Sequence, residues 1–256
     1  KIQVRLTSLR EDRTDGMSKE ILDQHRVLWE RKKVTRYLYN KWYGDIREVL
    51  VSGPTVELGA GTGNFKEFMP SAVSSDIVFC EWLDVVSDAM ALPYRDGSVG
   101  NFVLIDAIHH VKRPIAVIDE MQRCLKKGGR IAILDVYISP LSYLYYNFLH
   151  KEDVDLSADV FNMADDSVEK APFSSNQAIA TLLFFRGIER FMKSYPRLKV
   201  IRREARDFML YPLSGGFEGR QLVPFSMTGF FETVDKWGLR ILGSKVAARC
   251  LVVLEK

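Results

Sequence analysis

One short segment combines an acid with alternating glycines, a combination that could hold a positively charged ligand. Glu57, Gly59, Gly61 and Gly63 alternate with other residues in VELGAGTGNF, residues 56–65. Glycines at this spacing let the backbone turn tightly and approach a ligand closely. A carboxylate two residues before the first glycine would repel a pyrophosphate and attract an ammonium group. The segment therefore predicts a tight turn after a strand, at which a cation-bearing ligand binds.

Two other kinds of glycine-rich turn do not match this spacing. A phosphate-binding P-loop has a lysine and a hydroxyl residue directly after its glycines, whereas Gly63 is followed by Asn64 and Phe65. The dinucleotide fingerprint places its third glycine three residues after its second, whereas Gly63 comes two residues after Gly61. S-adenosylmethionine carries an ammonium and a sulfonium group, so it is the cofactor that this turn fits best.

The chain around the turn alternates between strand-like and helix-like segments. Apolar, β-rich runs include TVEL, AVSSD, LDVVSD, NFVLID and RIAILDV, and residues 114–125 have the pattern of a helix. Such alternation predicts a parallel sheet with helices on its faces. Ligands of these sheets bind at the carboxyl ends of the strands. Asp76, Asp88 and Asp106 each close one of the runs and are therefore expected at the ligand site.

Outside this region the pattern changes twice. Apolar residues recur at helical spacing over 17–43, which predicts an amphipathic helix, and a short helix is expected over 45–51. After residue 138 the strand rhythm stops and returns only near the end of the chain. We expect an N-terminal arm and helices over 1–52, a cofactor-binding core over 53–138, a helical insertion serving as a substrate lid over 139–196, and the last strands with a substrate loop over 197–256.

Five segments, in order, resemble the class I S-adenosylmethionine-dependent methyltransferases of the methyltransferase type 11 kind. Residues 57–63 look like the first motif of that family, and SDAMALPYRDGSV is similar to its D-A-x-x-L-P segment. The resemblance continues through NFVLIDAIHHV and EMQRCLKKGGRIAILD and covers about residues 54–138. It implies an α/β three-layer sandwich, Rossmann-like, with a seven-stranded mixed sheet whose last strand is antiparallel.

The resemblance also implies which residues bind the cofactor. Glu57 would hold the methionine portion, Asp76 the ribose hydroxyls and Asp88 the adenine amino group. The short spacing between Asp76 and Asp88 leaves no room for the helix and strand that the family usually has there. The other expected cofactor-binding residues are Gly59, Ala60, Gly61, Gly63, Ala89, Met90 and Asp106.

Three histidines are candidate general bases. An imidazole titrates near neutral pH and could take the proton from a hydroxyl group as that group is methylated. His109 and His110 follow the expected fourth strand, where a structural role is the alternative, and His150 opens the acidic stretch of the insertion. We order the candidates His150, His109 and His110. A metal site made by His150, Glu152 and Asp155 matches no known ligand spacing, so no metal is expected.

The acceptor is expected to contact two segments. YLYYNFL in the insertion could be a core helix or an apolar substrate wall, and the glycine-rich YPLSGGFEGRQLVPF could form a substrate loop or a lid hinge. The candidate substrate-binding residues in these segments are Tyr143, Tyr146, Tyr211, Gly215, Gly216 and Phe217.

Composition limits the partners. The 256 residues carry a net charge of +3, too small to require nucleic acid as a partner, and the basic cluster over 186–206 is best interpreted as a solvated surface. No run approaches the roughly 18 apolar residues of a membrane span. Three widely spaced cysteines indicate reduced thiols and a cytoplasmic setting. The oligomeric state stays open.

The sequence therefore predicts methyl transfer from S-adenosylmethionine to a small-molecule acceptor such as a natural product, a sugar or a lipid-linked metabolite. Oxygen is the expected nucleophile. Two alternatives remain open: an RNA or nucleotide methyltransferase, and a non-catalytic module that keeps the fold and binds a partner.

Overall fold

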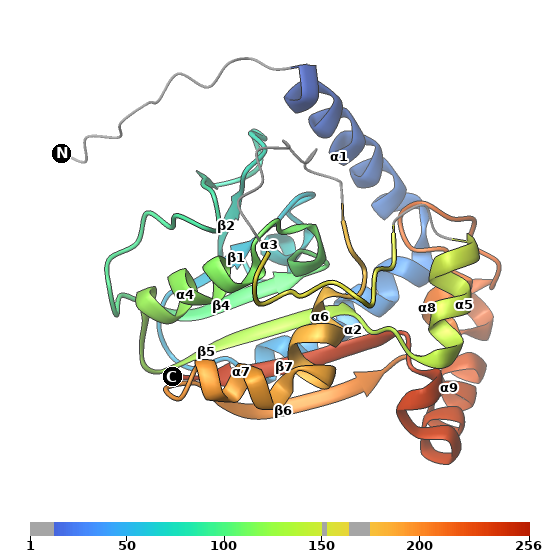
Figure 1. Cartoon of the computed structure of the whole chain (residues 1–256). Helices are drawn as coiled ribbons and strands as arrows, with labels where there is room; N and C mark the ends of the chain where they lie inside the picture. The colour runs from blue at the N-terminus through green and yellow to red at the C-terminus, as the bar shows by residue number, and fades with distance from the viewer. Residues whose placement is uncertain (1–12, 150–152, 164–174) are drawn as a thin grey trace.

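A seven-stranded mixed sheet forms the centre of the molecule (Figure 1). The computed structural model describes residues 13–149, 153–163 and 175–256. The strand order is β3-β2-β1-β4-β5-β7-β6, with β7 antiparallel to both of its neighbours. The predicted α/β class and the antiparallel last strand are confirmed. The strands are β1 (Thr55–Leu58), β2 (Val73–Asp76), β3 (Val85–Val86), β4 (Val99–Ile105), β5 (Leu125–Val136), β6 (Lys199–Arg206) and β7 (Arg249–Glu255).

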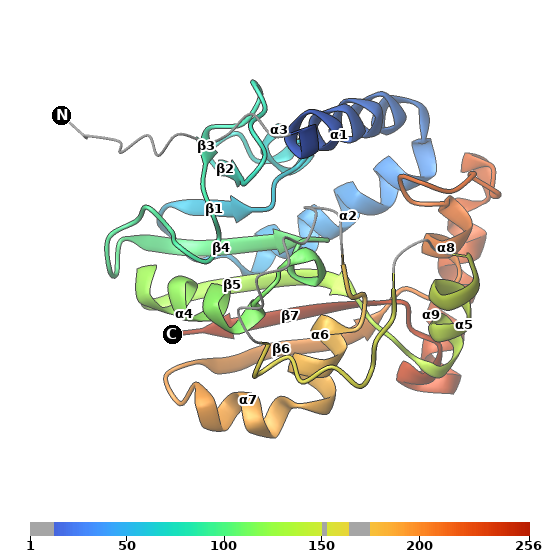
Figure 2. The same cartoon turned by 45° about the horizontal axis from the view of Figure 1, so that its top comes forward.

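Helices cover both faces of the sheet. Side chains alternate between the two faces along each strand, and β4 is buried at every position, so both faces carry side chains that pack against helices. Phe102 and Leu104 of β4 pack on one face, against the core of α4 (Pro114–Cys124) and α7 (Ile188–Ser194). Val103 and Ile105 pack on the other, against α2 (Lys33–Val49), α3 (Asn64–Phe68) and α8 (Leu210–Ser214). Figure 2 shows α4 and α7 in front of the sheet and α2 behind it. The three-layer sandwich predicted from the sequence is present.

The connection between β2 and β3 contains no helix. Residues 77–84 cross directly from Asp76 to β3, as the short spacing in the sequence predicted. The carboxylate of Asp84 accepts hydrogen bonds from the backbone N–H and the hydroxyl of Ser74, both at 2.9 Å. These bonds fasten the shortened connection to β2.

The long N-terminal helix predicted over 17–43 is in fact two helices, α1 (Arg13–Arg31) and α2. The chain bends at Lys32, whose φ of −89° and ψ of 82° leave the helical region. Lys32 Nζ donates to the carbonyl oxygens of Gly215 (3.3 Å), Gly216 (2.6 Å) and Gly219. Bending here lets α1 leave the sheet face and reach across the carboxyl ends of the strands.

The segment predicted as an insertion, residues 139–196, divides into two parts. It begins with α5 (Pro140–Leu149), which lies with α8 and α9 (Thr228–Leu242) at one end of the sheet (Figures 1 and 2). Its second part, with α6 (Ile179–Thr181), the π-helical turn η2 (Leu182–Arg186) and α7, buries Phe184 and Phe191 against the sheet. This second part is the crossover from β5 to β6, and the lid role of the segment stays a prediction.

Three short 3-10 helices complete the described elements: η1 (Ile108–His110), η3 (Phe225–Met227) and η4 (Gly243–Val246). Across the part of the chain that the structure describes, no helix combines the length and the apolar character needed to cross a membrane.

Candidate active site

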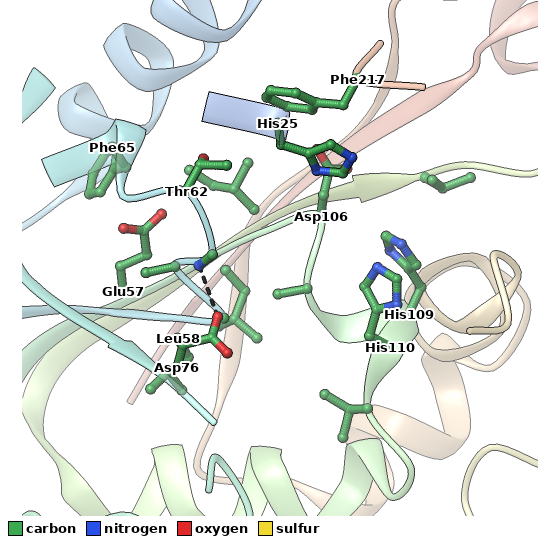
Figure 3. Close-up of a pocket in the computed structure, with 18 of the residues that line it drawn as sticks. His25, Glu57, Leu58, Thr62, Phe65, Asp76, Asp106, His109, His110 and Phe217 are labelled. Atoms are coloured by element: carbon green, nitrogen blue, oxygen red, sulfur yellow. Dashed lines mark hydrogen bonds between the residues drawn. The ribbon is translucent and has the colours of Figure 1, made fainter. Parts of the chain in front are cut away.

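A cavity of about 540 Å³ lies at the carboxyl ends of the strands. Its wall includes the loop after β1, the end of β2 and the residues that follow β4. The volume falls within the range of roughly 300–1,000 Å³ that small-molecule sites occupy. Figure 3 shows Glu57 and Asp76 on one side of this cavity and His109 and His110 on the other. The cavity thus has two chemically different ends.

The glycine turn is held in place by close packing and by hydrogen bonds. Gly59 has φ +69°, and a Cβ at this position would lie 2.7 Å from the Cβ of Ala107. The Gly61 N–H donates to Asp76 Oδ2 at 2.8 Å, the dashed line in Figure 3, and Trp82 Nε1 donates to the Gly61 carbonyl at 2.9 Å. Gly59 therefore lets the turn pack closely against Ala107, while the bonds to Asp76 and Trp82 fix the position of Gly61.

Glu57 is a buried acid whose hydrogen bonding is incomplete. The residue is 4% exposed, and its Oε2 has no hydrogen-bond partner among the described residues. Burial, together with the charge of Asp76, raises the pKa of Glu57 well above its ordinary value. A buried carboxyl of this kind calls for a cationic donor. The ammonium group of S-adenosylmethionine would supply such a donor, so the residue fits the cofactor.

The other acids on this side contribute to the wall and also fix the backbone. Asp76 Oδ1 accepts from the Val78 N–H at 2.9 Å, while its Oδ2 holds Gly61. Burial raises the pKa of Asp76, although these N–H groups act in the opposite direction. Asp88 Oδ1 accepts from the Met90 N–H at 2.8 Å. Each carboxylate oxygen can accept a further bond, so the ribose and adenine roles of Asp76 and Asp88 stay predictions compatible with this geometry.

The other end of the cavity contains a histidine paired with a buried acid. His109 Nδ1 lies 2.6 Å from Asp135 Oδ1, and the two side chains are 5% and 0% exposed. Asp135 also accepts from the N–H groups of Ile108 (3.2 Å) and Val136 (2.7 Å). Burial alone would raise the pKa of Asp135, but His109, Arg249 and the Val136 N–H hold it below the ordinary value. Asp135 is therefore a carboxylate that accepts a hydrogen bond from the Nδ1–H of His109.

The comparisons with known proteins agree with this cofactor end. Residues 56–133 match the family model of a methyltransferase domain. The chain is 32% identical over 84 residues to the ubiquinone/menaquinone biosynthesis C-methyltransferase UbiE of Ruegeria sp., an alignment covering 32% of this chain and 33% of that protein. Over 53 residues it is 40% identical to the methyltransferase GfsG of Streptomyces halstedii, covering 21% of this chain and 19% of that protein. Residues 56–133 of this chain therefore belong to a methyltransferase domain.

The relatives match only part of their own length, a third or less. The fold extends much further. A solved S-adenosylmethionine-dependent methyltransferase from Thermotoga maritima, described as a possible histamine N-methyltransferase, gives a TM-score of 0.54 at 16% identity. That likeness covers 95% of this chain and 99% of the other. It shows a shared fold over nearly the whole chain.

Most residues predicted from the sequence lie in the cavity wall. Two of the predicted residues that the structure describes do not. Gly63 lies just outside the wall, where it precedes α3, and Tyr143 is 36% exposed on the outer side of α5. Tyr145, which the sequence analysis did not select, lines the cavity beside Tyr146. The predicted residues that line it are Glu57, Gly59, Ala60, Gly61, Asp76, Asp88, Ala89, Met90, Asp106, His109, His110, Tyr146, Tyr211, Gly215, Gly216 and Phe217.

The loop after α8 closes the acceptor side of the cavity. Phe217 stacks on His25 of α1 with ring centroids 5.1 Å apart, and Lys32 holds the backbone of the same loop. Burial, assisted by the charge of Lys32, lowers the pKa of His25 against the opposing effect of Glu218. A neutral imidazole therefore faces the cavity from a helix that the sequence analysis did not connect with the site.

Asp106 is held by two residues that the sequence analysis also missed. It has φ +52°, a strained conformation for a residue other than glycine. Its Oδ2 accepts from the Tyr39 hydroxyl at 2.5 Å, and its Oδ1 is ion-paired with Arg249. One signal was present in the sequence: Arg249 is a charge inside the apolar run AARCLVVLEK, where an arginine needs a buried partner.

The candidate base His150 lies outside the described residues, and so does Glu152 of the alternative metal set. The third member of that set, Asp155, accepts hydrogen bonds from the N–H and the hydroxyl of Ser157. A different group brings ligand atoms within 4.8 Å of one another: Asp106, His109 and Asp135. Because Arg249 already pairs with Asp106 and would repel a metal ion, we interpret this group as a hydrogen-bonding cluster rather than a metal centre.

Proposed function

We propose that this protein transfers the methyl group of S-adenosylmethionine to an oxygen atom of a small-molecule acceptor. The observation that carries the proposal is the hydrogen bond of 2.6 Å between Asp135 and His109, of which His109 lines the cavity. Because Asp135 accepts this bond from Nδ1–H, the basic lone pair of His109 is the one on Nε2. A hydroxyl group placed against that nitrogen would give up its proton as it attacks.

The cofactor, when bound, supplies a methyl group already activated by the sulfonium. The bond between sulfur and methyl breaks as the bond between oxygen and methyl forms, and the acceptor proton goes to His109. Alignment of the reacting atoms therefore supplies most of the catalysis, and the base adds to it. Glu57 would hold the cofactor at the far end of the cavity, where its uncompensated oxygen needs a cation.

The shape of the acceptor side supports a small molecule. Tyr145, Tyr146, Tyr211 and Phe217 contribute aromatic rings to the cavity from α5, α8 and the loop that follows. An aromatic wall of this kind suits a compact, largely apolar acceptor.

The basic cluster over 186–206 gives limited support to the RNA alternative. None of its described members lines the cavity. Arg190 pairs with Asp159, Arg202 with Glu204, and Arg206 with Asp45 and Asp207. Three of the cluster's cations are therefore already paired with acids, which leaves fewer of them for a phosphate backbone.

The relative UbiE is named as a C-methyltransferase. The family match covers residues 56–133, so it includes the cofactor end and His109 but ends before Asp135, α5 and the loop of residues 215–219. Oxygen as the nucleophile rests on the pairing of His109 with Asp135, a residue outside that match.

Transfer of a tritiated methyl group tests the proposal. The protein is incubated with labelled S-adenosylmethionine and cell extract, and the products are separated into a low-molecular-mass fraction and an RNA fraction. We expect the label in the low-molecular-mass fraction, in a methyl ether or methyl ester, and its amount should not change on ribonuclease treatment. The variant His109→Gln should incorporate much less label. Label in RNA, or on carbon or nitrogen of the product, would overturn it.

Calorimetry with S-adenosylmethionine separates the remaining alternative, a non-catalytic module. If both the unmodified protein and His109→Gln release heat on binding the cofactor, the variant is folded. Its lower activity is then a defect in methyl transfer and not in cofactor binding. Absence of binding by the unmodified protein at millimolar cofactor would favour the module that binds a partner instead.

A further inference from the structure

The outer face of α9 exposes large apolar side chains in one stripe. Phe230, Trp237 and Ile241 are 61%, 58% and 71% exposed. Their spacing of seven and four residues places all three on the same side of the helix. Single exposed apolar residues are ordinary, but a contiguous set of this size on one helix marks an interaction surface.

The stripe continues onto neighbouring segments. Leu222, Phe225 and Met227, in the chain leading into α9, are 70%, 47% and 41% exposed. On α5, which contacts the η4 turn that follows α9, Leu141 and Leu144 also point outward. Both views place α5 beside α9 (Figures 1 and 2). We call this surface the α9 face; its residues are Leu141, Leu144, Leu222, Phe225, Met227, Phe230, Trp237, Ile241 and Leu242.

On α9 and η4, the acidic side chains are paired or buried, whereas the basic side chains are exposed. Glu232 is ion-paired with Lys41 at 2.5 Å. Asp235 is 8% exposed and accepts from the backbone N–H groups of residues 208–210. The exposed charges are therefore cations, listed here in chain order: Lys236, Arg240 and Lys245.

We propose that the α9 face docks on the surface of an anionic lipid bilayer. A helix with tryptophan, phenylalanine and aliphatic residues on one side and only cations beside them is the pattern of helices that lie in the membrane interface. Tryptophan is favoured at that depth, and lysine and arginine are attracted to anionic headgroups. A protein partner of this surface would need acidic residues around an apolar groove, whereas a bilayer supplies both features everywhere.

The position of the α9 face gives the docking a consequence. α8 contacts α9 and leads directly into the loop of residues 215–219, which lines the cavity. α5 shows Tyr145 and Tyr146 to the cavity and Leu141 and Leu144 to the outside. A docked protein would therefore hold the acceptor side of its cavity next to the lipid. The docking itself does not depend on the proposed methyl transfer.

Vesicle co-sedimentation tests the proposal. The probes are vesicles of phosphatidylcholine alone and of phosphatidylcholine with phosphatidylglycerol. We expect binding to the anionic vesicles, weakened at least about tenfold by Trp237→Ala with Ile241→Ser, since the loss of buried apolar groups reduces partitioning steeply. Lys236→Glu with Arg240→Glu should weaken binding to anionic vesicles by roughly 25-fold or more, because each cation contributes about fivefold.

Ile201→Ser provides the matched control. Ile201 is a 46% exposed isoleucine on β6, away from the α9 face, so its loss should leave vesicle binding unchanged. Cofactor binding by every variant shows that each is folded. The proposal would be overturned if the unmodified protein bound neither kind of vesicle. It would also be overturned if the α9 variants bound as well as the Ile201→Ser control. So would a dimer in sedimentation equilibrium that the Trp237 and Ile241 changes dissociate, since the face would then join two copies of the chain.

Discussion

The guanidinium group of Arg249, at the start of β7, is ion-paired with the carboxylate of Asp106, which directly follows β4. Arg249 is fully buried, with the rings of Trp42 and Tyr211 4.9 and 4.7 Å from its guanidinium carbon. Removing one partner leaves the other charge uncompensated. We therefore expect Arg249→Met to lower the free energy of unfolding by about 3–5 kcal/mol, measured by denaturant titration.

The double variant Arg249→Met with Asp106→Asn checks the cause. Because neither charge then remains, the double variant should lose less free energy of unfolding than the two single variants lose together. Additive losses would show that the two groups stabilise the fold independently and that Asp106 owes its position to other contacts.

Asp135→Asn should change the proton position on His109. A carboxylate can only accept hydrogen bonds, whereas the amide of asparagine can also donate one. The variant therefore no longer requires the proton of His109 to be on Nδ1. We expect methyl transfer to fall by about 10²-fold or more with little change in cofactor binding. Nitrogen NMR of the imidazole ring reads the tautomer directly, without an acceptor substrate. An unchanged Nδ1–H signal in the variant would remove Asp135 from this role.

The cofactor end could be predicted because its information is local. Residues 57–63 form one continuous turn, and the strands beside it are short apolar runs that alternate with helices. Buried strands of a parallel sheet need apolar side chains on both faces, and β4 has them throughout. Spacing alone therefore determined where Glu57 and Asp76 would lie.

The acceptor end could not be predicted in the same way, because remote segments build it. His25, Tyr39 and Arg249 reach the cavity from α1, α2 and β7. In the sequence, Tyr39 belongs to an amphipathic pattern that a core helix explains equally well. The bend at Lys32, which brings α1 over the cavity, depends on carbonyl groups of the distant loop 215–219.

Tyr143 lies outside the cavity wall, whereas Tyr145 and Tyr146 on the same helix line it. YLYYNFL is apolar all round, so its periodicity does not show which side faces the cavity. The helix begins with a reciprocal cap: the Ser142 N–H donates to Ser139 Oγ at 3.0 Å, and the Ser139 N–H donates to Ser142 Oγ at 2.8 Å. Tyr146 is buried in the core, and this tertiary packing, which the local pattern does not encode, sets the side of α5 that faces the cavity.

Glu57→Gln should weaken the binding of S-adenosylmethionine. A carboxylate paired with the cofactor's ammonium makes a charge-assisted hydrogen bond that an amide cannot replace. A loss of about 10- to 100-fold in affinity is expected at neutral pH, measured by calorimetry. Because the free protein holds Glu57 with a raised pKa, the affinity of the unmodified protein should increase as the pH rises through that value. An equal affinity of Glu57→Gln would place the ammonium elsewhere.

The same residue makes the stability of the free protein depend on pH. A carboxyl whose pKa is raised on folding contributes stability below its unfolded pKa, and this contribution is lost as the pH rises through the folded pKa. We expect the melting temperature of the cofactor-free protein to fall over that window, and to fall less in Glu57→Gln. A parallel decline in both proteins would assign the pH dependence to other groups.

Gly59→Ala should destroy cofactor binding and destabilise the fold, because the new Cβ would lie 2.7 Å from Ala107 at a φ of +69°. Gly44→Ala is the matched control: Gly44 lies inside α2 with nothing within 4 Å of its Cβ position. Alanine is favoured there by about 0.5–1 kcal/mol, so the control should melt at a higher temperature and bind the cofactor normally. The pair therefore separates close approach at the turn from a general effect of replacing glycine. If Gly59→Ala bound S-adenosylmethionine as well as Gly44→Ala does, the turn after β1 would not be the cofactor loop.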